Sequence, residues 1–176
     1  MRKIIFLVCL FFIVQLDAQL GVKGKFQTTL GVGISNYGAP QYLGLDYGLF
    51  RDISLGMEFS NRYSNETFKK FRILGGQANL NYHLNHLLQI YDEHWDLYLG
   101  GQFNYWLVTE NVKKIAPDSA VMGFGGQIGM RYFFNDHFAI NTELGCSTMA
   151  TEHYLRNESN LVGSFKLGLT YKFGRK

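Results

Sequence analysis

Three histidines form the only histidine cluster of the sequence and are the first candidates for binding a metal ion. His83, His86 and His94 lie within about 12 residues of one another. A zinc site in the usual ligand patterns would add cysteine or a suitably spaced carboxylate, and neither accompanies these histidines. We interpret His83 as a polar residue of the protein interior and the other two as turn residues. No metal or other cofactor is therefore expected.

The second group with catalytic potential is Asp118, Ser119 and His153. These residue types can form a relay in which histidine takes the proton of serine and a carboxylate orients the histidine. The first two are adjacent, and the histidine follows in a later polar segment. Serine and aspartate in such segments are more often turn formers. We therefore expect a protein that is not an enzyme.

The first residues have the pattern of a secretory signal peptide. Arg2 and Lys3 are positive, and an unbroken apolar run of about 11 residues follows at 4–14. That run is too short for the roughly 20 residues of a membrane-spanning helix. Ala18 provides a small residue before the expected cleavage point. We assign residues 1–18 to a cleaved export signal.

The remaining residues, 19–176, are expected to form one domain. Charged residues make up 18% of the chain, below the roughly 25% typical of soluble domains, and aromatic residues reach 16%. Cys146 is the only cysteine left after cleavage, so no internal disulfide can stabilise the exported fold. The basic residues form no block, which argues against a nucleic-acid partner.

Alternation of apolar and polar residues runs through this domain and predicts β-strands. From Leu161 to Phe173 the odd positions are apolar, aromatic or glycine, and the even positions are mostly polar or glycine. This period of two marks the two faces of a strand. We predict about eight strands and no helix, with strands near residues 26–35, 42–50, 53–60, 74–84, 97–107, 122–132, 138–149 and 161–173. An even number of strands of about ten residues is typical of a transmembrane β-barrel.

The connections fit an antiparallel up-and-down barrel whose outer loops are longer than its periplasmic turns. Outer loops are predicted at 36–41, 64–70, 110–119 and 151–160, and inner turns at 50–52, 85–95 and 135–137. Both prolines, Pro40 and Pro117, fall in predicted outer loops. That placement is expected because proline cannot donate a hydrogen bond to a strand ladder.

Two arguments place the apolar face outside, against lipid. An eight-stranded barrel is just wide enough inside for side chains, so bulky apolar residues from every strand would overfill it. A polar face in water would carry many Lys and Glu residues, whereas this face is rich in Gly, Ser, Asn and Gln. Aromatic residues near strand ends, such as Tyr105 and Trp106, fit the interfacial girdles of a membrane barrel. A soluble lipocalin-like barrel, with the faces reversed, is the alternative.

The predicted lumen is filled by side chains and contains charges of both signs. Buried charges need partners, so we predict a network of ion pairs. Its predicted members are Asp46, Glu58, Arg62, Arg131, Glu143, Lys166 and Lys172. Such a lumen argues against a general diffusion pore, which uses about 16–18 strands.

With its signal peptide, its alternating strands and a last strand ending in LGLTYKF at residues 167–173, the chain resembles the small outer-membrane β-barrels related to the OmpA barrel domain and OmpX. The resemblance implies a Gram-negative outer membrane, of Bacteroidota type, and recognition of a C-terminal aromatic residue by the barrel-assembly machinery. Here Phe173 is followed by residues 174–176, a departure from that pattern. Outer-membrane palmitoyltransferases carry a loosely similar serine, aspartate and histidine set, but they need an apolar lumen.

These features favour a structural protein of the outer membrane whose loops make surface interactions. Basic residues in or beside the outer loops are predicted to contact the phosphates of lipopolysaccharide; they are Lys69, Lys70, Arg72, Lys113, Lys114 and Arg156. One alternative is an accessory subunit of a secretion or conjugation apparatus, with a periplasmic partner docked on the long turn 85–95. Another is a lipid A-modifying enzyme.

Overall fold

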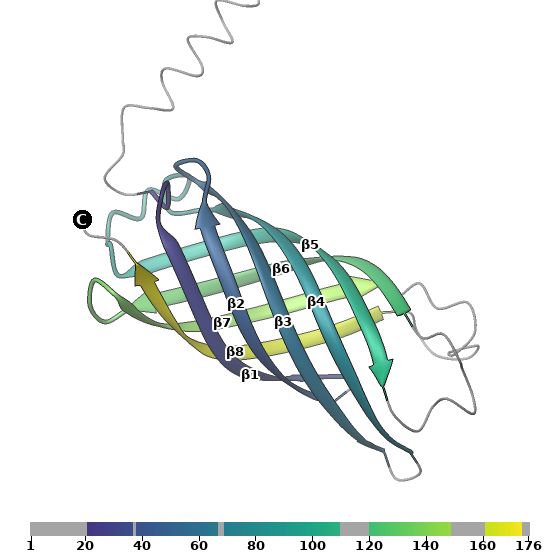
Figure 1. Cartoon of the computed structure of the whole chain (residues 1–176). Helices are drawn as coiled ribbons and strands as arrows, with labels where there is room; N and C mark the ends of the chain where they lie inside the picture. The colour runs from purple at the N-terminus through teal and green to yellow at the C-terminus, as the bar shows by residue number, and fades with distance from the viewer. Residues whose placement is uncertain (1–20, 37, 67–68, 110–119, 149–160, 174–176) are drawn as a thin grey trace, which may run out of the picture.

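The computed structural model describes residues 21–36, 38–66, 69–109, 120–148 and 161–173 (Figure 1). They form eight strands: β1 (Phe26–Ser35), β2 (Ala39–Gly48), β3 (Ile53–Glu66), β4 (Lys69–His83), β5 (Trp95–Thr109), β6 (Ala120–Phe133), β7 (Phe138–Thr148) and β8 (Leu161–Phe173). Each strand pairs antiparallel with the next, and β8 pairs with β1, so the sheet closes into a barrel. The all-β barrel expected from the sequence is confirmed. Within the described ranges, no helix has the length and apolarity needed to cross a membrane.

Closure gives every strand two hydrogen-bonded neighbours. The first and last strands, far apart in sequence, are joined from Phe26 opposite Phe173 to Ser35 opposite Ser164. Hydrocarbon contains no water to satisfy an unpaired backbone N–H or C=O group, so a spanning sheet must have no free edge. The closed ladder meets this requirement without a disulfide, and Cys146, in β7, is a free thiol.

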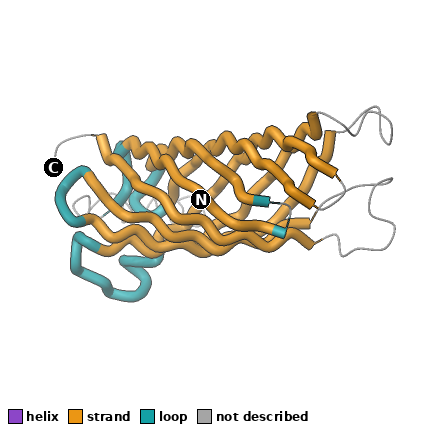
Figure 2. The backbone as a smooth tube through the Cα atoms, turned by 90° about the horizontal axis from the view of Figure 1, so that it is seen from below, coloured by secondary structure: helices purple, strands orange, loops and turns teal. Residues whose placement is uncertain are grey.

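The turns after β2, β4 and β6 gather at one end of the barrel (Figure 2). They comprise residues 49–52, 84–94 and 134–137. Asn135 closes the last of them by accepting hydrogen bonds from two backbone N–H groups with its side-chain oxygen. Because β1 begins and β8 ends here as well, we take this end as the periplasmic one, in the usual orientation of such barrels.

At the opposite, outer end, one predicted loop is mostly strand. β3 continues to Glu66 and β4 begins at Lys69, so the prediction of a loop at 64–70 is wrong. The alternation fades there because residues 64–66 are all polar. A strand that extends beyond the bilayer surface meets water on its outer face, and the period of two that marks a half-buried strand is lost.

Pro40 is a second correction, because it lies in β2 and not in a loop. The continuous ladder between β1 and β2 stops at Gln41 and resumes as an isolated bridge between Ser35 and Gly38. Pro40 itself is paired with β3, opposite Arg62. Proline is tolerated near a strand end where the ladder does not need its missing N–H group. Pro117, in contrast, lies outside the described residues.

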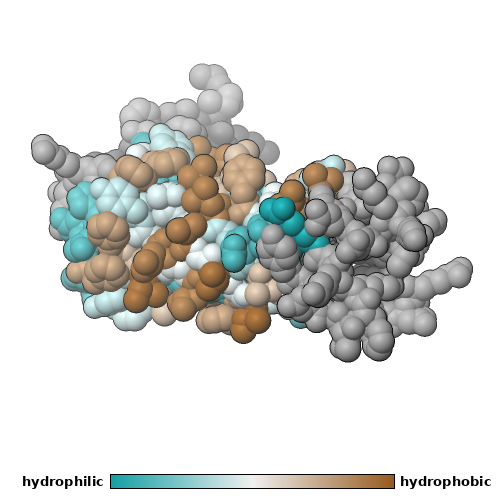
Figure 3. All heavy atoms as spheres, turned by 60° about the horizontal axis from the view of Figure 1, so that its bottom comes forward, coloured by the Kyte–Doolittle hydropathy of each residue, from teal (hydrophilic) through white to brown (hydrophobic). Residues whose placement is uncertain are grey.

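Outward-facing apolar side chains on every strand form an apolar wall, one side of which is seen in Figure 3. Leu30, Phe124 and Leu169 are 68%, 68% and 60% exposed. The next residues along the strands point inward, where the hydroxyls of Thr29 and Thr170 lie 2.8 Å apart. Large apolar side chains exposed all around a barrel fit a hydrocarbon environment and not water. The apolar-out arrangement therefore rules against the lipocalin-like alternative.

Large aromatic side chains enter the lumen where the adjacent strand carries glycine. Tyr98 lies over Gly129, where an added Cβ would be 2.2 Å from the tyrosine Cζ, and Trp106 lies over Gly75, where it would be 2.7 Å from the indole Cδ1. The prediction that Trp106 belongs to an interfacial girdle is wrong, because this side chain is 3% exposed inside the lumen. Successive strand residues face opposite sides of the sheet, so of the pair Tyr105 and Trp106 only the tyrosine faces lipid.

Leu167→Arg tests the lipid-facing wall. Leu167 is 46% exposed in the middle of β8. We expect the variant to lower the free energy of unfolding by about 2–4 kcal/mol, because a charge near the bilayer midplane is costly. Urea unfolding of the barrel in phospholipid vesicles measures this loss. Tyr91→Arg, in the turn 84–94, is the control and should change little; equal stability of the two variants would contradict a lipid-facing Leu167.

Candidate functional site

The centre of the lumen is an ion-pair cluster around Lys166 of β8. Its Nζ lies 2.7 Å from Glu58 Oε2 of β3 and 3.0 Å from Glu143 Oε1 of β7. The Tyr98 hydroxyl of β5 donates to Glu143 Oε2 at 3.0 Å. All four side chains are buried, and Lys166 is only 1% exposed. One cation thus holds two carboxylates from strands that are far apart in the sequence.

A second cluster lies closer to the periplasmic end, around Arg131 of β6. Its guanidinium contacts Asp46 Oδ2 at 2.6 Å and Asp96 Oδ2 at 3.4 Å. It also lies over the ring of Tyr98, 4.6 Å from the ring centroid. We did not predict Asp96 as a lumen residue, because it is the second residue of β5 and the alternation becomes clear only after it. Its place opposite Arg131 in the strand register was the missing signal.

Side-chain amides connect the two clusters. Gln77 accepts a hydrogen bond from Lys166 at 3.5 Å and donates to Gln127 at 3.0 Å. Gln127 donates to Asn81 at 2.8 Å, and Asn81 donates to Asp46 at 3.4 Å. Amides can donate and accept at once, which lets them continue a chain between a cation and a carboxylate. A continuous chain of polar contacts therefore runs from the Lys166 cluster to the Arg131 cluster.

The structure brings five of the seven predicted lumen charges into these two clusters and places the other two towards the ends of the barrel. Arg62 lies over the ring of Trp106, 4.9 Å from its centroid, and donates to Ser35 Oγ at 3.4 Å. Lys172 lies 4.3 Å above the ring of Phe133 near the periplasmic end. Cations over aromatic faces gain electrostatic stabilisation. The polar network is thus capped at each end by a cation stacked on a ring.

Ser54, His83 and Asp96 have the order of a nucleophilic relay. His83 Nδ1 lies 2.6 Å from Asp96 Oδ1, and its Nε2 lies 3.0 Å from Ser54 Oγ. With Nδ1 donating to the carboxylate, Nε2 accepts the serine proton, as in serine hydrolases. Ser54 is 2% exposed, however, and Asp96 also binds Arg131. The geometry supports a hydrogen-bonded tie between β3, β4 and β5, which matches the interpretation of His83 as an interior residue.

The other two histidines of the predicted cluster lie in the turn 84–94, apart from His83. His86 Nδ1 is 2.7 Å from the guanidinium of Arg51 in the neighbouring turn. The backbone N–H of His94 donates to Asp92 and, with the imidazole 2.7 Å away, holds the pKa of that carboxyl below its ordinary value. Among the described residues, no group of three or more His, Cys, Asp or Glu side chains could hold a metal ion.

The predicted lipopolysaccharide contacts are only partly described. Lys69 and Lys70 begin β4 at the outer end. Arg72 follows on the outward face of the same strand, and its Nε donates to Asn61 Oδ1 of β3 at 2.8 Å. Lys113, Lys114 and Arg156 lie outside the described residues. So do Asp118, Ser119 and His153, the residues with catalytic potential that we interpret as turn formers.

The long periplasmic turn 84–94 contains several internal hydrogen bonds. Asn85 braces it by donating to the carbonyl of Trp95 and accepting a hydrogen bond from the Leu97 amide. The backbone amide of Leu88 donates to the carbonyl of Leu84 at 2.8 Å. The tip is apolar and exposed: Leu87, Leu88 and Tyr91 are 63%, 53% and 71% exposed. The turn thus presents apolar side chains on a fixed backbone.

Comparison with known proteins identifies a matching family and similar solved structures. A family profile described as "Outer membrane protein beta-barrel domain" matches residues 4–173. Among solved structures, the chain is similar to the N-terminal β-barrel domain of Pseudomonas aeruginosa OprF, with 13% identity, TM-score 0.56, 86% of this chain and 98% of that chain covered.

Two further structures show the same fold. Neisserial surface protein A is 14% identical, with TM-score 0.57, 85% of this chain and 95% of that chain covered. A major outer membrane protein from Thermus thermophilus is 12% identical, with TM-score 0.60, 85% of this chain and 99% of that chain covered. No curated protein matches the sequence.

Lys166→Met tests the central cluster. We expect a loss of about 3–5 kcal/mol in the free energy of unfolding, because Glu58 and Glu143 would remain buried without their cation. Adding Glu58→Gln and Glu143→Gln should restore most of it. Urea unfolding in vesicles measures both, and Lys172→Met, which removes a less buried lysine, serves as the control. A loss no greater than that of the control would show that the cluster contributes little.

Proposed function

Because this chain belongs to the outer membrane β-barrel domain family, we propose that it serves the outer membrane as a structural barrel whose outer rim binds lipopolysaccharide. The family implies an outer-membrane location. The observation that carries the rest of the proposal is the filled lumen, which leaves the wall and the two ends as the surfaces available for function.

The side chains that the structure describes leave little open space in the middle of the lumen. Its cavity beside Glu58, Tyr98 and Glu143 measures about 20 Å³, the space of one water molecule. The ion pairs of Lys166 cross this level of the barrel. Among the described residues, most of the side chains buried in the lumen are polar, which does not suit an acyl chain and supports a role without enzymatic chemistry.

The outer rim supports the lipopolysaccharide contact. Arg72 points outward beside Asn61, and Lys69 and Lys70 precede it on β4. Lys113 and Lys114 follow β5 in the sequence, and β5 is the hydrogen-bonded neighbour of β4. Each cation close to an anionic membrane surface contributes about 1 kcal/mol of binding. Phosphate groups in the outer leaflet are the ligands that this arrangement fits.

Charge reversal tests the rim. Lys113→Glu with Lys114→Glu should lower the lipopolysaccharide that co-purifies with the folded barrel by about tenfold or more, because two attractive charges of about 1 kcal/mol each become repulsive. The matched control is Lys23→Glu with Lys25→Glu, which changes net charge equally at the periplasmic end. Equal retention by the two double variants would remove the proposal.

The ordered apolar turn 84–94 favours a second candidate function, an accessory subunit of an envelope apparatus. Leu87, Leu88 and Tyr91 would form the contact, because exposed apolar side chains on a fixed backbone are typical of docking surfaces. The partner would be a periplasmic subunit of a secretion or conjugation system.

A photo-crosslinking residue at Tyr91 tests this second function. It should give a discrete adduct in intact cells, identified by mass spectrometry as such a subunit, whereas the same residue at His137 in another periplasmic turn should not. Adducts with lipid alone, or the same adducts from both positions, would exclude a specific partner.

A further inference from the structure

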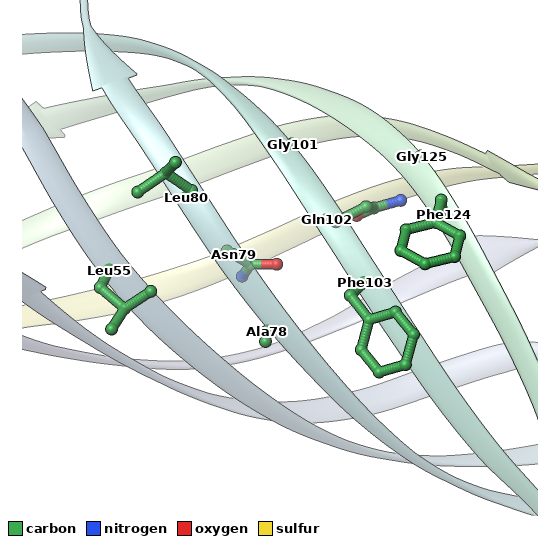
Figure 4. A pocket seen from close by; sticks show the side chains of 9 residues that line it. All are labelled: Leu55, Ala78, Asn79, Leu80, Gly101, Gln102, Phe103, Phe124 and Gly125. Carbon is green, nitrogen blue, oxygen red and sulfur yellow. The ribbon is translucent and has the colours of Figure 1, made fainter.

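The outer wall contains a hollow over β3 to β6 (Figure 4). It is a shallow, open depression of about 390 Å³, bordered by Leu55, Leu80, Phe103 and Phe124, with Ala78 and Gly101 in its floor. The rings of Phe103 and Phe124 contact each other, with centroids 5.1 Å apart, and form a firm border on one side. All of these side chains belong to the apolar face of the barrel.

Small residues create the hollow, and the fold itself does not require them. An added Cβ at Gly101 would meet nothing within 4 Å, and at the neighbouring outward residues Gly126 and Gly76 it would meet only backbone oxygens at 3.6 and 3.9 Å. Most inward-facing glycines differ; at Gly100, for example, a Cβ would lie 2.1 Å from Asn81 Oδ1. The glycines inside make room for the lumen, whereas those outside leave space that only the surroundings can fill.

Those surroundings are hydrocarbon, because the hollow continues the lipid-facing wall. Gly101 lies between Trp95 and Tyr105 on the outward face of β5, away from both strand ends. An apolar hollow at this depth excludes water, and unfilled volume would forfeit van der Waals contacts along its walls. A lipid acyl chain, present all around the barrel, is therefore the natural occupant.

The charge at the outer rim and the distance from the rim to the hollow indicate which membrane leaflet supplies the acyl chain. The outward residues of β4 run from Arg72 at the outer rim past Leu74 and Gly76 to Ala78 in the hollow. Six residues of strand cover about 20 Å. At the usual tilt of about 35–45° this corresponds to roughly 15 Å of depth, which is half of a hydrocarbon core of about 30 Å.

An anionic lipid with its phosphate beside Arg72 would thus place a chain in the hollow from the outer leaflet. The periplasmic end of β5 is less suited to a phosphate, because the exposed carboxylate of Asp92 lies just before that strand. We propose that the hollow binds one acyl chain of a lipopolysaccharide molecule whose phosphate lies beside Arg72. This inference rests on the proposed lipopolysaccharide-binding function and extends it from the rim to the wall.

Filling the hollow tests the proposal. Gly101→Leu and Ala78→Leu place bulk inside it, and Gly163→Leu is the matched control, because Gly163 also faces outward and an added Cβ there would meet only Asn36 Oδ1 at 3.6 Å. Each variant is purified from the outer membrane of a lipopolysaccharide-containing host in mild detergent. Native mass spectrometry then measures the fraction that retains lipopolysaccharide or phospholipid, and a heat-modifiability gel shows that each barrel is folded.

We expect both filling variants to lower the lipopolysaccharide-bound fraction by about tenfold, the effect of losing burial of about two methylene groups, and the control to leave it unchanged. Arg72→Gln should lower the same fraction without changing bound phospholipid. Equal retention by Gly101→Leu and Gly163→Leu would overturn the proposal. If the filling variants lose bound phospholipid but keep lipopolysaccharide, the proposal is also overturned. The same holds if the wild-type protein is a dimer and the filling variants are monomers with the same amount of bound lipid.

The rim variants separate this proposal from the function on which it rests. If Lys113→Glu with Lys114→Glu keeps lipopolysaccharide while Gly101→Leu loses it, the rim contact fails and the hollow is supported. If the rim variants lose lipopolysaccharide and Gly101→Leu does not, the hollow is excluded and the rim contact stands.

Discussion

Closure of the strand ladder is the constraint on which the whole molecule depends. A sheet can cross hydrocarbon only when each backbone N–H and C=O group has a partner, and this is achieved where β8 meets β1. Closure also determines the lumen, because eight strands enclose a space that side chains fill. Once the barrel is closed, alternate residues of every strand must face lipid or this narrow interior.

The narrow interior explains why the buried charges form a network. A charge inside the barrel is far from water and costs free energy unless it is paired and hydrogen-bonded. Lys166 therefore holds two carboxylates, Arg131 holds two more, and amides join the two groups. Among the described residues, the side chains of this network occupy the middle of the lumen. The interactions that we propose therefore lie on the wall and at the two ends of the barrel.

The sequence by itself determined the strand number, the barrel class and which face of each strand meets lipid. These follow from a local property, the alternation of side chains, which is strong wherever one face meets hydrocarbon. The alternation fails where both faces are polar, and for that reason β3 was predicted to end before Glu66. Pro40 was misplaced for a related reason: composition shows that proline lacks a donor, but not that the ladder at this position does without one.

Only the tertiary structure decided which groups meet across the barrel. Glu58, Glu143 and Lys166 come from three strands far apart in sequence, and the register of the closed sheet sets the distances between them. The same register brings Asp96 to Arg131 and turns Trp106 inward. The hollow in the wall is likewise a property of neighbouring strands, since Gly101 leaves a hollow only where larger residues such as Phe103 and Phe124 border it. Alternation is a local property that can be recognised in the sequence. The distances between side chains on different strands are set only when the strands pair in register.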